Sequence, residues 1–324
     1  MWDFSLSNAV GAMQKTLPFV LFRMAIYLGI TIAYIIATGL GAGIGYGLTA
    51  FGQNPGSGAG LGGLIGFGAV SGVLYWAREY LLYMVKAGHI AVLVEILDGK
   101  ALPENQGQIA YAQGVIQQRF KETSLLFGLD QLIKGILHAA NRMLLGLTSW
   151  LPIPGLDNLV SLVNKVLDMS LTYVDEVIIA YHLRIKSDNP WQSSQDALVL
   201  YAQNYKVLLK NAVFLMLFMY GLSFLVFLVF LAPVGALMGL FPGHIGGWSF
   251  IIALVMAWSV KAALLEPIAI HALMQVYFKT IEGQTPNPEW RDKLSSASSQ
   301  FRELGEKAAQ SLGMGAKSGP QQSA

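Results

Sequence analysis

Cysteine is absent from all 324 residues, which excludes disulfides, thiolate catalysis, iron–sulfur clusters and zinc sites with cysteine ligands. The chain also lacks an HExxH motif, a GxSxG motif and a phosphate-binding loop, and its 5 histidines are scattered. Its basic residues form no patch of the kind that binds nucleic acid. We therefore expect no cofactor, no metal site and no nucleic-acid partner, and we do not expect an enzyme.

Charge is also scarce, because only 12% of the residues are charged while 54% are hydrophobic. A soluble domain typically carries about twice that share of charge. No cleavable signal peptide is evident, because the first apolar segment is too long and no cleavage site follows it. The chain is therefore predicted to be an all-α, multi-pass protein of the lipid bilayer. The apolar runs long enough to cross it lie at about 17–46, 60–80, 208–231 and 248–272.

The distribution of Lys and Arg predicts the orientation of these runs. The tips 47–59 and 232–247 contain neither residue, whereas 86–121, 184–210 and 279–317 contain most of them. Both termini are therefore expected in the cytoplasm, with the protein in the inner or plasma membrane.

The segment 121–185 reads as two amphipathic helices joined by the turn Trp150–Gly155. Each helix would be ~40 Å long, which is enough to cross a bilayer. The uncharged turn favours crossing, and the fold would then have three hairpins: four clear transmembrane helices plus this central one. Alternatively, the hairpin lies on the membrane surface or packs on cytoplasmic parts of the bundle. The polar ridge of its first helix comprises Asp130, Lys134, His138 and Arg142, and the second helix carries Asp168, Asp175 and Glu176.

The fourth apolar run contains Lys261 and Glu266. A charge at the centre of the bilayer costs about 2.5–3.5 kcal/mol, which makes both residues candidates for a site. Counted from Trp248, however, Glu266 is ~27 Å along the helix, near the cytoplasmic interface. The spacing of five residues also predicts different faces, about 140° apart on an α-helix. The sequence therefore favours interfacial residues over a site, and Arg23 is likewise expected to extend toward the headgroups.

Glycines recur at helical spacing in the first two runs. Without a Cβ atom, two helices approach closely and gain dispersion contacts that lipid cannot replace. Tight packing of one hairpin is the favoured interpretation, and the outer seam would suit a helix of a second copy of the chain. The seams are Gly39, Gly43 and Gly47, then Gly41 and Gly45, and on the next run Gly62 with Gly66 and Gly68 with Gly72.

The predicted domains follow one another along the chain. They are a first membrane hairpin with a cytoplasmic helix (1–120), the central hairpin (121–185), a second membrane hairpin with a cytoplasmic helix (186–304) and a disordered tail (305–324).

The first and second membrane hairpins also look like copies of one unit. Trp76 and His89 are 13 residues apart, as are Trp258 and His271. An acidic residue and a glycine follow each pair, at Asp98-Gly99 and Glu282-Gly283. The common shift of about 185 residues predicts a parallel internal repeat.

From about residue 120 onward, a set of residues carries a family resemblance. The set is Leu126-Phe-Gly128, Arg142, Tyr173, Ile178–Tyr181, Ser194–Ala197, Asn204, Gly221 and Glu282-Gly283. With these residues the chain resembles the C-terminal membrane region of choline transporter-like proteins. The similarity implies that the central hairpin crosses the membrane and that the protein transports a solute.

The sequence thus predicts a transporter or permease for a small polar or cationic solute, with the path along the central hairpin. Its carboxylates would attract the cation, and Lys134 and Arg142 would pair with them. Lys261 and Glu266 are further candidates for this path. The alternative is a membrane scaffold that does not transport, in which the hairpin and 283–304 recruit partners or sense lipid.

Overall fold

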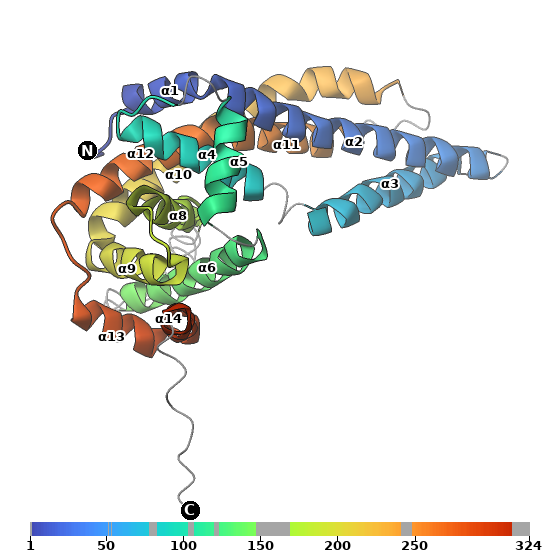
Figure 1. Ribbon diagram of the computed structural model, residues 1–324. Coiled ribbons are helices and arrows are strands. Elements are labelled where there is room, and N and C mark those ends of the chain that lie inside the picture. The colour runs from blue at the N-terminus through green and yellow to red at the C-terminus, as the bar shows by residue number, and fades with distance from the viewer. Residues whose placement is uncertain are drawn as a thin grey trace, which may run out of the picture. The chain divides into compact units, whose positions relative to one another are not determined.

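The computed structural model describes residues 2–50, 52, 54–77, 83–102, 107–119, 123–146, 169–240 and 248–312. These segments are helices joined by turns and contain no strand (Figure 1). The all-α prediction is therefore confirmed. The turn Trp150–Gly155 and Asp168 lie outside the described residues.

Four helical stretches are long and apolar enough to cross a membrane, so the chain is a membrane-embedded protein. The stretch Trp248–Thr280 is built from α11 (Trp248–Val260), the π-helix η4 (Lys261–Leu265) and α12 (Glu266–Thr280). The other three are α2 (Leu17–Thr49), the first 21 residues of α3 (Pro55–Ala77) and α10 (Tyr205–Met238). The three-hairpin arrangement, the orientation and the kind of membrane stay predictions.

The chain divides into two compact units, each discontinuous in sequence. Unit 1 comprises 1–15, 86–216 and 268–324, and unit 2 comprises 16–85 and 217–267. The predicted domain limits are consecutive segments instead, and they stay predictions.

In unit 2, α2 and α3 form an antiparallel pair (Figure 1). The two helices approach each other closely at glycines. A Cβ atom on Gly41 would overlap the carbonyl oxygen of Gly62, and one on Gly66 would overlap that of Ala37. A Cβ atom on Gly43 or Gly47, by contrast, would meet no atom within 4 Å. On α2, Gly41 and Gly45 therefore pack against α3, whereas Gly43 and Gly47 do not, and Gly39 of that second seam is buried.

Unit 1 is built from the shorter helices α1 (Leu6–Lys15), α5 (Gln108–Arg119), α8 (Val174–Ile185), α9 (Pro190–Gln203), α13 (Pro288–Ala297) and α14 (Ser299–Ser311). Most of α4 (Tyr83–Leu97), all of α6 (Thr123–Gly146) and the 3-10 turn Leu171–Tyr173 also belong to it. Capping residues explain where several helices begin. Asn189 accepts from the backbone N–H of Gln192 at 3.1 Å, and Ser298 accepts from that of Phe301 at 3.2 Å.

The ends of three helices in unit 1 share one backbone feature. Gly99 follows α4 with φ 69°, Lys186 follows α8 with φ 53°, and Gly283 follows α12 with φ 71°. A left-handed residue at this position is a common way to end a helix. Gly99 and Gly283 occupy equivalent places in the predicted repeat, which itself stays a prediction.

Candidate functional site

The three charged residues of unit 2 that the structure describes meet in one buried cluster. Arg23 on α2 places its guanidinium 3.3 Å from one carboxylate oxygen of Glu266, and the Lys261 ammonium lies 3.1 Å from the other. The side chains of Arg23, Lys261 and Glu266 are only 1%, 6% and 10% exposed. We call these residues the ion cluster. Its carboxylate is shared, with one oxygen facing each cation.

The π-helix Lys261–Leu265 creates this geometry. At its end, the backbone N–H of Glu266 donates to the carbonyl oxygen of Lys261, five residues back. Residues five apart are about 140° apart on an α-helix, but a π-turn is wider and places them nearly above one another. The prediction that Lys261 and Glu266 lie on different faces was therefore wrong, because it assumed an ideal α-helix.

The same turn explains the position of Arg23. In an α-helix the N–H of Glu266 would bond to the carbonyl of Ala262, which is instead left available in the π-turn. Arg23 donates to that carbonyl oxygen through the same terminal nitrogen that faces Glu266. The expectation that Arg23 extends toward the headgroups was wrong, because a carbonyl group and a carboxylate within unit 2 hold it.

Further polar groups continue along the same face of α2. Tyr27, Thr31, Tyr34 and Thr38 follow Arg23 at spacings of three and four residues, which is one side of a helix. The Thr31 hydroxyl lies 2.8 Å from that of Ser259, and the Tyr34 hydroxyl 3.1 Å from that of Ser71. The buried Thr38 hydroxyl has no hydrogen-bond partner in the described part of the chain. This polar face therefore extends from the ion cluster into the helix packing of unit 2.

Lys261 has a second contact besides Glu266. Its ammonium lies 4.7 Å from the centroid of the Tyr220 ring on α10, close enough for a cation–π interaction. Arg23 is held in place by two acceptors, whereas Lys261 has a flexible side chain with a compact charge. In the ion cluster, Arg23 is therefore the anchored cation, and Lys261 is the cation that has a second contact besides Glu266.

The central ridge belongs to unit 1. Asp130 is buried and pairs with Lys134, whose ammonium also lies 4.0 Å from a carboxylate oxygen of Asp175. Glu176 is buried as well and pairs with Lys86 at the start of α4. The structure therefore brings Asp130, Lys134 and Asp175 together, and it adds Lys86, which sequence reasoning did not single out as a partner. The other two ridge residues, His138 and Arg142, are exposed.

The helices that pack against α6 indicate whether the central hairpin crosses the membrane. α6 contacts α8, α9, α13 and α14. The last two helices are rich in charged residues, and α6 is not among the helices apolar enough to cross a membrane. The expectation that the central hairpin crosses the membrane is therefore not confirmed.

A serine–histidine pair occurs in unit 1, although no catalytic motif predicts one. The His182 ring nitrogen lies 2.7 Å from the Ser193 hydroxyl. The two residues are 0% and 2% exposed, and the Ser193 hydroxyl also lies within hydrogen-bond distance of the Asn189 and Pro190 carbonyl oxygens at the start of α9. This contact joins α8 to α9 and is closed to a substrate.

Comparison of the chain with protein-family models, with curated proteins and with solved structures gives no match. The resemblance to choline transporter-like proteins therefore stays a prediction, and the geometry of the ion cluster carries the functional argument.

Proposed function

We propose that this membrane protein transports a small cationic solute, and that the solute binds at the Glu266 carboxylate. The observation that carries the proposal is the ion cluster itself. All the charge in the described part of unit 2 is gathered at one π-turn, within a helical stretch long enough to cross a membrane.

The energetics favour a function over simple stabilisation. Burying ions costs several kcal/mol each, and a well-packed apolar substitute for a buried ion pair is often as stable or more so. Charged residues within membrane helices generally mark pathways for ions or substrates. π-turns also occur frequently at functional sites. A purely structural contact between α2 and the fourth helical stretch would need neither feature.

The two cations suggest how a solute would enter. Arg23 is anchored by the Ala262 carbonyl, so it would hold the Glu266 carboxylate in place. The incoming cation would replace the Lys261 ammonium beside Glu266. The displaced ammonium would then be stabilised by the ring of Tyr220. Glu266 would then exchange one cation for another without remaining unpaired, which lowers the cost of exchange in a low-dielectric site.

The proposed path therefore does not run along the central hairpin. The ridge residues Asp130, Lys134 and Asp175 pair with one another in unit 1, beside the charged helices α13 and α14. That packing favours the alternative in which the hairpin lies outside the hydrocarbon core.

Transport is tested with the purified full chain in proteoliposomes. Uptake of radiolabelled choline would be driven by an inside-negative potassium diffusion potential. We expect uptake above that of protein-free vesicles, a loss of at least about tenfold for Glu266→Gln, and no change for Glu306→Gln on the exposed face of α14. Lys261→Met removes the competing cation and should lower the KM for choline.

Two results would overturn this proposal. One is vesicles that take up neither choline nor sodium faster than protein-free vesicles. The other is a Glu266→Gln variant that transports like the wild type. Elution as a single species in size-exclusion chromatography would show that each variant is folded before its transport is compared.

A further inference from the structure

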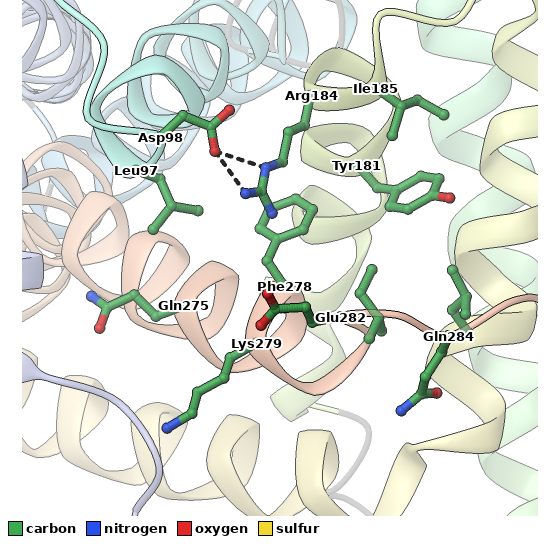
Figure 2. Close-up of a pocket in the computed structure, with 12 residues that line it drawn as sticks. Leu97, Asp98, Tyr181, Arg184, Ile185, Gln275, Phe278, Lys279, Glu282 and Gln284 are labelled. Carbon is green, nitrogen blue, oxygen red and sulfur yellow. Dashed lines mark hydrogen bonds and ion pairs between the residues drawn. The ribbon is translucent and has the colours of Figure 1, made fainter.

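Unit 1 contains a polar cleft of about 680 Å³, a size typical of sites for small molecules. It lies where α4, α8 and α12 end, and Figure 2 shows the side chains around it. Its walls combine charged groups with apolar ones, including Leu97 and Ile281. The residues that bear on recognition are Asp98, Tyr181, Arg184, Phe278, Lys279 and Glu282.

One cation of the cleft is held in a fixed position. Two nitrogens of the Arg184 guanidinium lie 2.8 and 2.7 Å from the same oxygen of Asp98, as the dashed lines in Figure 2 mark. The guanidinium also stacks over the Phe278 ring at 4.3 Å. Two of its five N–H groups suffice for Asp98, so donors remain for an acidic group of a ligand.

Asp98 is itself well placed to hold Arg184. Burial tends to raise the pKa of Asp98, but hydrogen bonds from Lys100 and Arg184 outweigh it and leave the pKa below its usual value. The carboxylate therefore stays ionised at neutral pH, and the position of Arg184 does not depend on a ligand.

Two further charged side chains line the cleft and are available to a ligand. Lys279 and Glu282 are exposed, and neither makes an ion pair or a side-chain hydrogen bond with any residue that the structure describes. In Figure 2 the Glu282 carboxylate lies beside Phe278, whereas Lys279 extends away from it. The cleft thus offers an unpaired carboxylate and an unpaired ammonium group, at separate places, beside the fixed guanidinium of Arg184.

The helix ends add to the field in the cleft. The final turns of α4, α8 and α12 all contribute lining residues. A helix C-terminus carries about half a negative charge on its last carbonyl groups. Together with Glu282, these carbonyls favour an ammonium group, whereas Arg184 is placed to hold an acidic group.

We propose that this cleft binds a zwitterion in which an ammonium group and a phosphate are joined by a short carbon chain, as in phosphoethanolamine. Arg184 binds the phosphate, and Glu282 binds the ammonium group. The rings of Phe278 and Tyr181 cover the carbon chain. The ligand is either the soluble compound or the headgroup of a phospholipid. This inference does not depend on the transport proposal, because all of its residues belong to unit 1.

Calorimetric titration of the purified full chain in a maltoside detergent tests recognition of both ends of the ligand. We expect phosphoethanolamine to bind at least about tenfold more tightly than inorganic phosphate or ethanolamine, since each of these engages one end only. Glu282→Gln should weaken phosphoethanolamine about tenfold and leave phosphate unchanged, and Arg184→Gln should weaken both. Glu306→Gln and Arg302→Gln make the same changes of charge outside the cleft and should have no effect.

The lipid form is tested in nanodiscs that contain phosphatidylethanolamine, phosphatidylcholine and phosphatidylglycerol in equal amounts. Native mass spectrometry would count the lipids retained on the wild type and on Glu282→Gln. Selective retention of phosphatidylethanolamine by the wild type, without binding of the soluble compound, would assign the site to the headgroup. If neither form binds, or if Glu282→Gln behaves like the wild type in both assays, the inference is wrong.

Discussion

The guanidinium of Arg23 donates a hydrogen bond to the carbonyl oxygen of Ala262, the oxygen that the π-turn releases from its α-helical partner. The turn and the arginine therefore depend on each other. Without Arg23 a buried carbonyl and a buried carboxylate would each lose a donor, and without the turn Arg23 would lose one acceptor.

Substitution of Arg23 by methionine should destabilise the protein by about 3–5 kcal/mol, because it leaves buried Glu266 with one cation fewer. Thermal unfolding in detergent measures the effect, and Arg302→Met on the exposed face of α14 is the matched control. A variant as stable as the wild type would mean that Arg23 does not hold this turn.

The glycine seams on α2 predict different effects on stability for two alanine substitutions. Gly41→Ala should cost about 1–3 kcal/mol by overpacking, since its Cβ atom would overlap the Gly62 carbonyl oxygen. Gly43→Ala, two residues away, meets open space and should be neutral or stabilising by up to about 1 kcal/mol. Thermal unfolding of both variants under one condition measures the difference in stability. Equal stability of the two variants would argue against close packing at Gly41.

Asp98 makes a prediction about pH. Its pKa in the folded protein is below the usual value of 3.8, because Lys100 and Arg184 outweigh the effect of burial. The corresponding stability is therefore fully present above pH 3.8 and is lost as the pH falls through the lower folded value.

Asp98→Asn should accordingly lower the stability by about 1 kcal/mol at pH 7, and the difference from the wild type should shrink below pH 4. Melting temperatures between pH 7 and pH 3 measure it. Asp292→Asn, at an exposed position of α13, controls for general effects of charge. A difference that does not change with pH would show that the Asp98 charge is not responsible.

The contacts of α6 predict that the turn of the central hairpin does not reach the far side of the membrane. The chain has no cysteine, so single cysteines at Ser149 and Asn158 report cleanly on accessibility. We expect a membrane-impermeant thiol reagent to label them only after intact cells are permeabilised. Labelling from outside would restore the arrangement with six crossings and the path along the central ridge.

The amino-acid sequence by itself determined that this is an all-α membrane protein, because apolar runs of spanning length and scarce charge leave few alternatives. It also indicated that α2 and α3 pack through glycines, since helical spacing of small residues depends only on local periodicity. Asp130 and Lys134 are one helical turn apart, so their pairing likewise follows from spacing.

Only the tertiary structure decided which of these features come together. Lys261 and Glu266 face one another because one π-turn changes the local period, and Arg23 reaches them from a helix more than two hundred residues away. Neither fact follows from periodicity, because a hydrophobic pattern specifies the face of a regular helix but not where its hydrogen bonding shifts by one residue. The cleft in unit 1 could not be predicted from the sequence for a related reason. Its residues lie at the ends of helices that are distant in the chain, and packing alone brings those ends together.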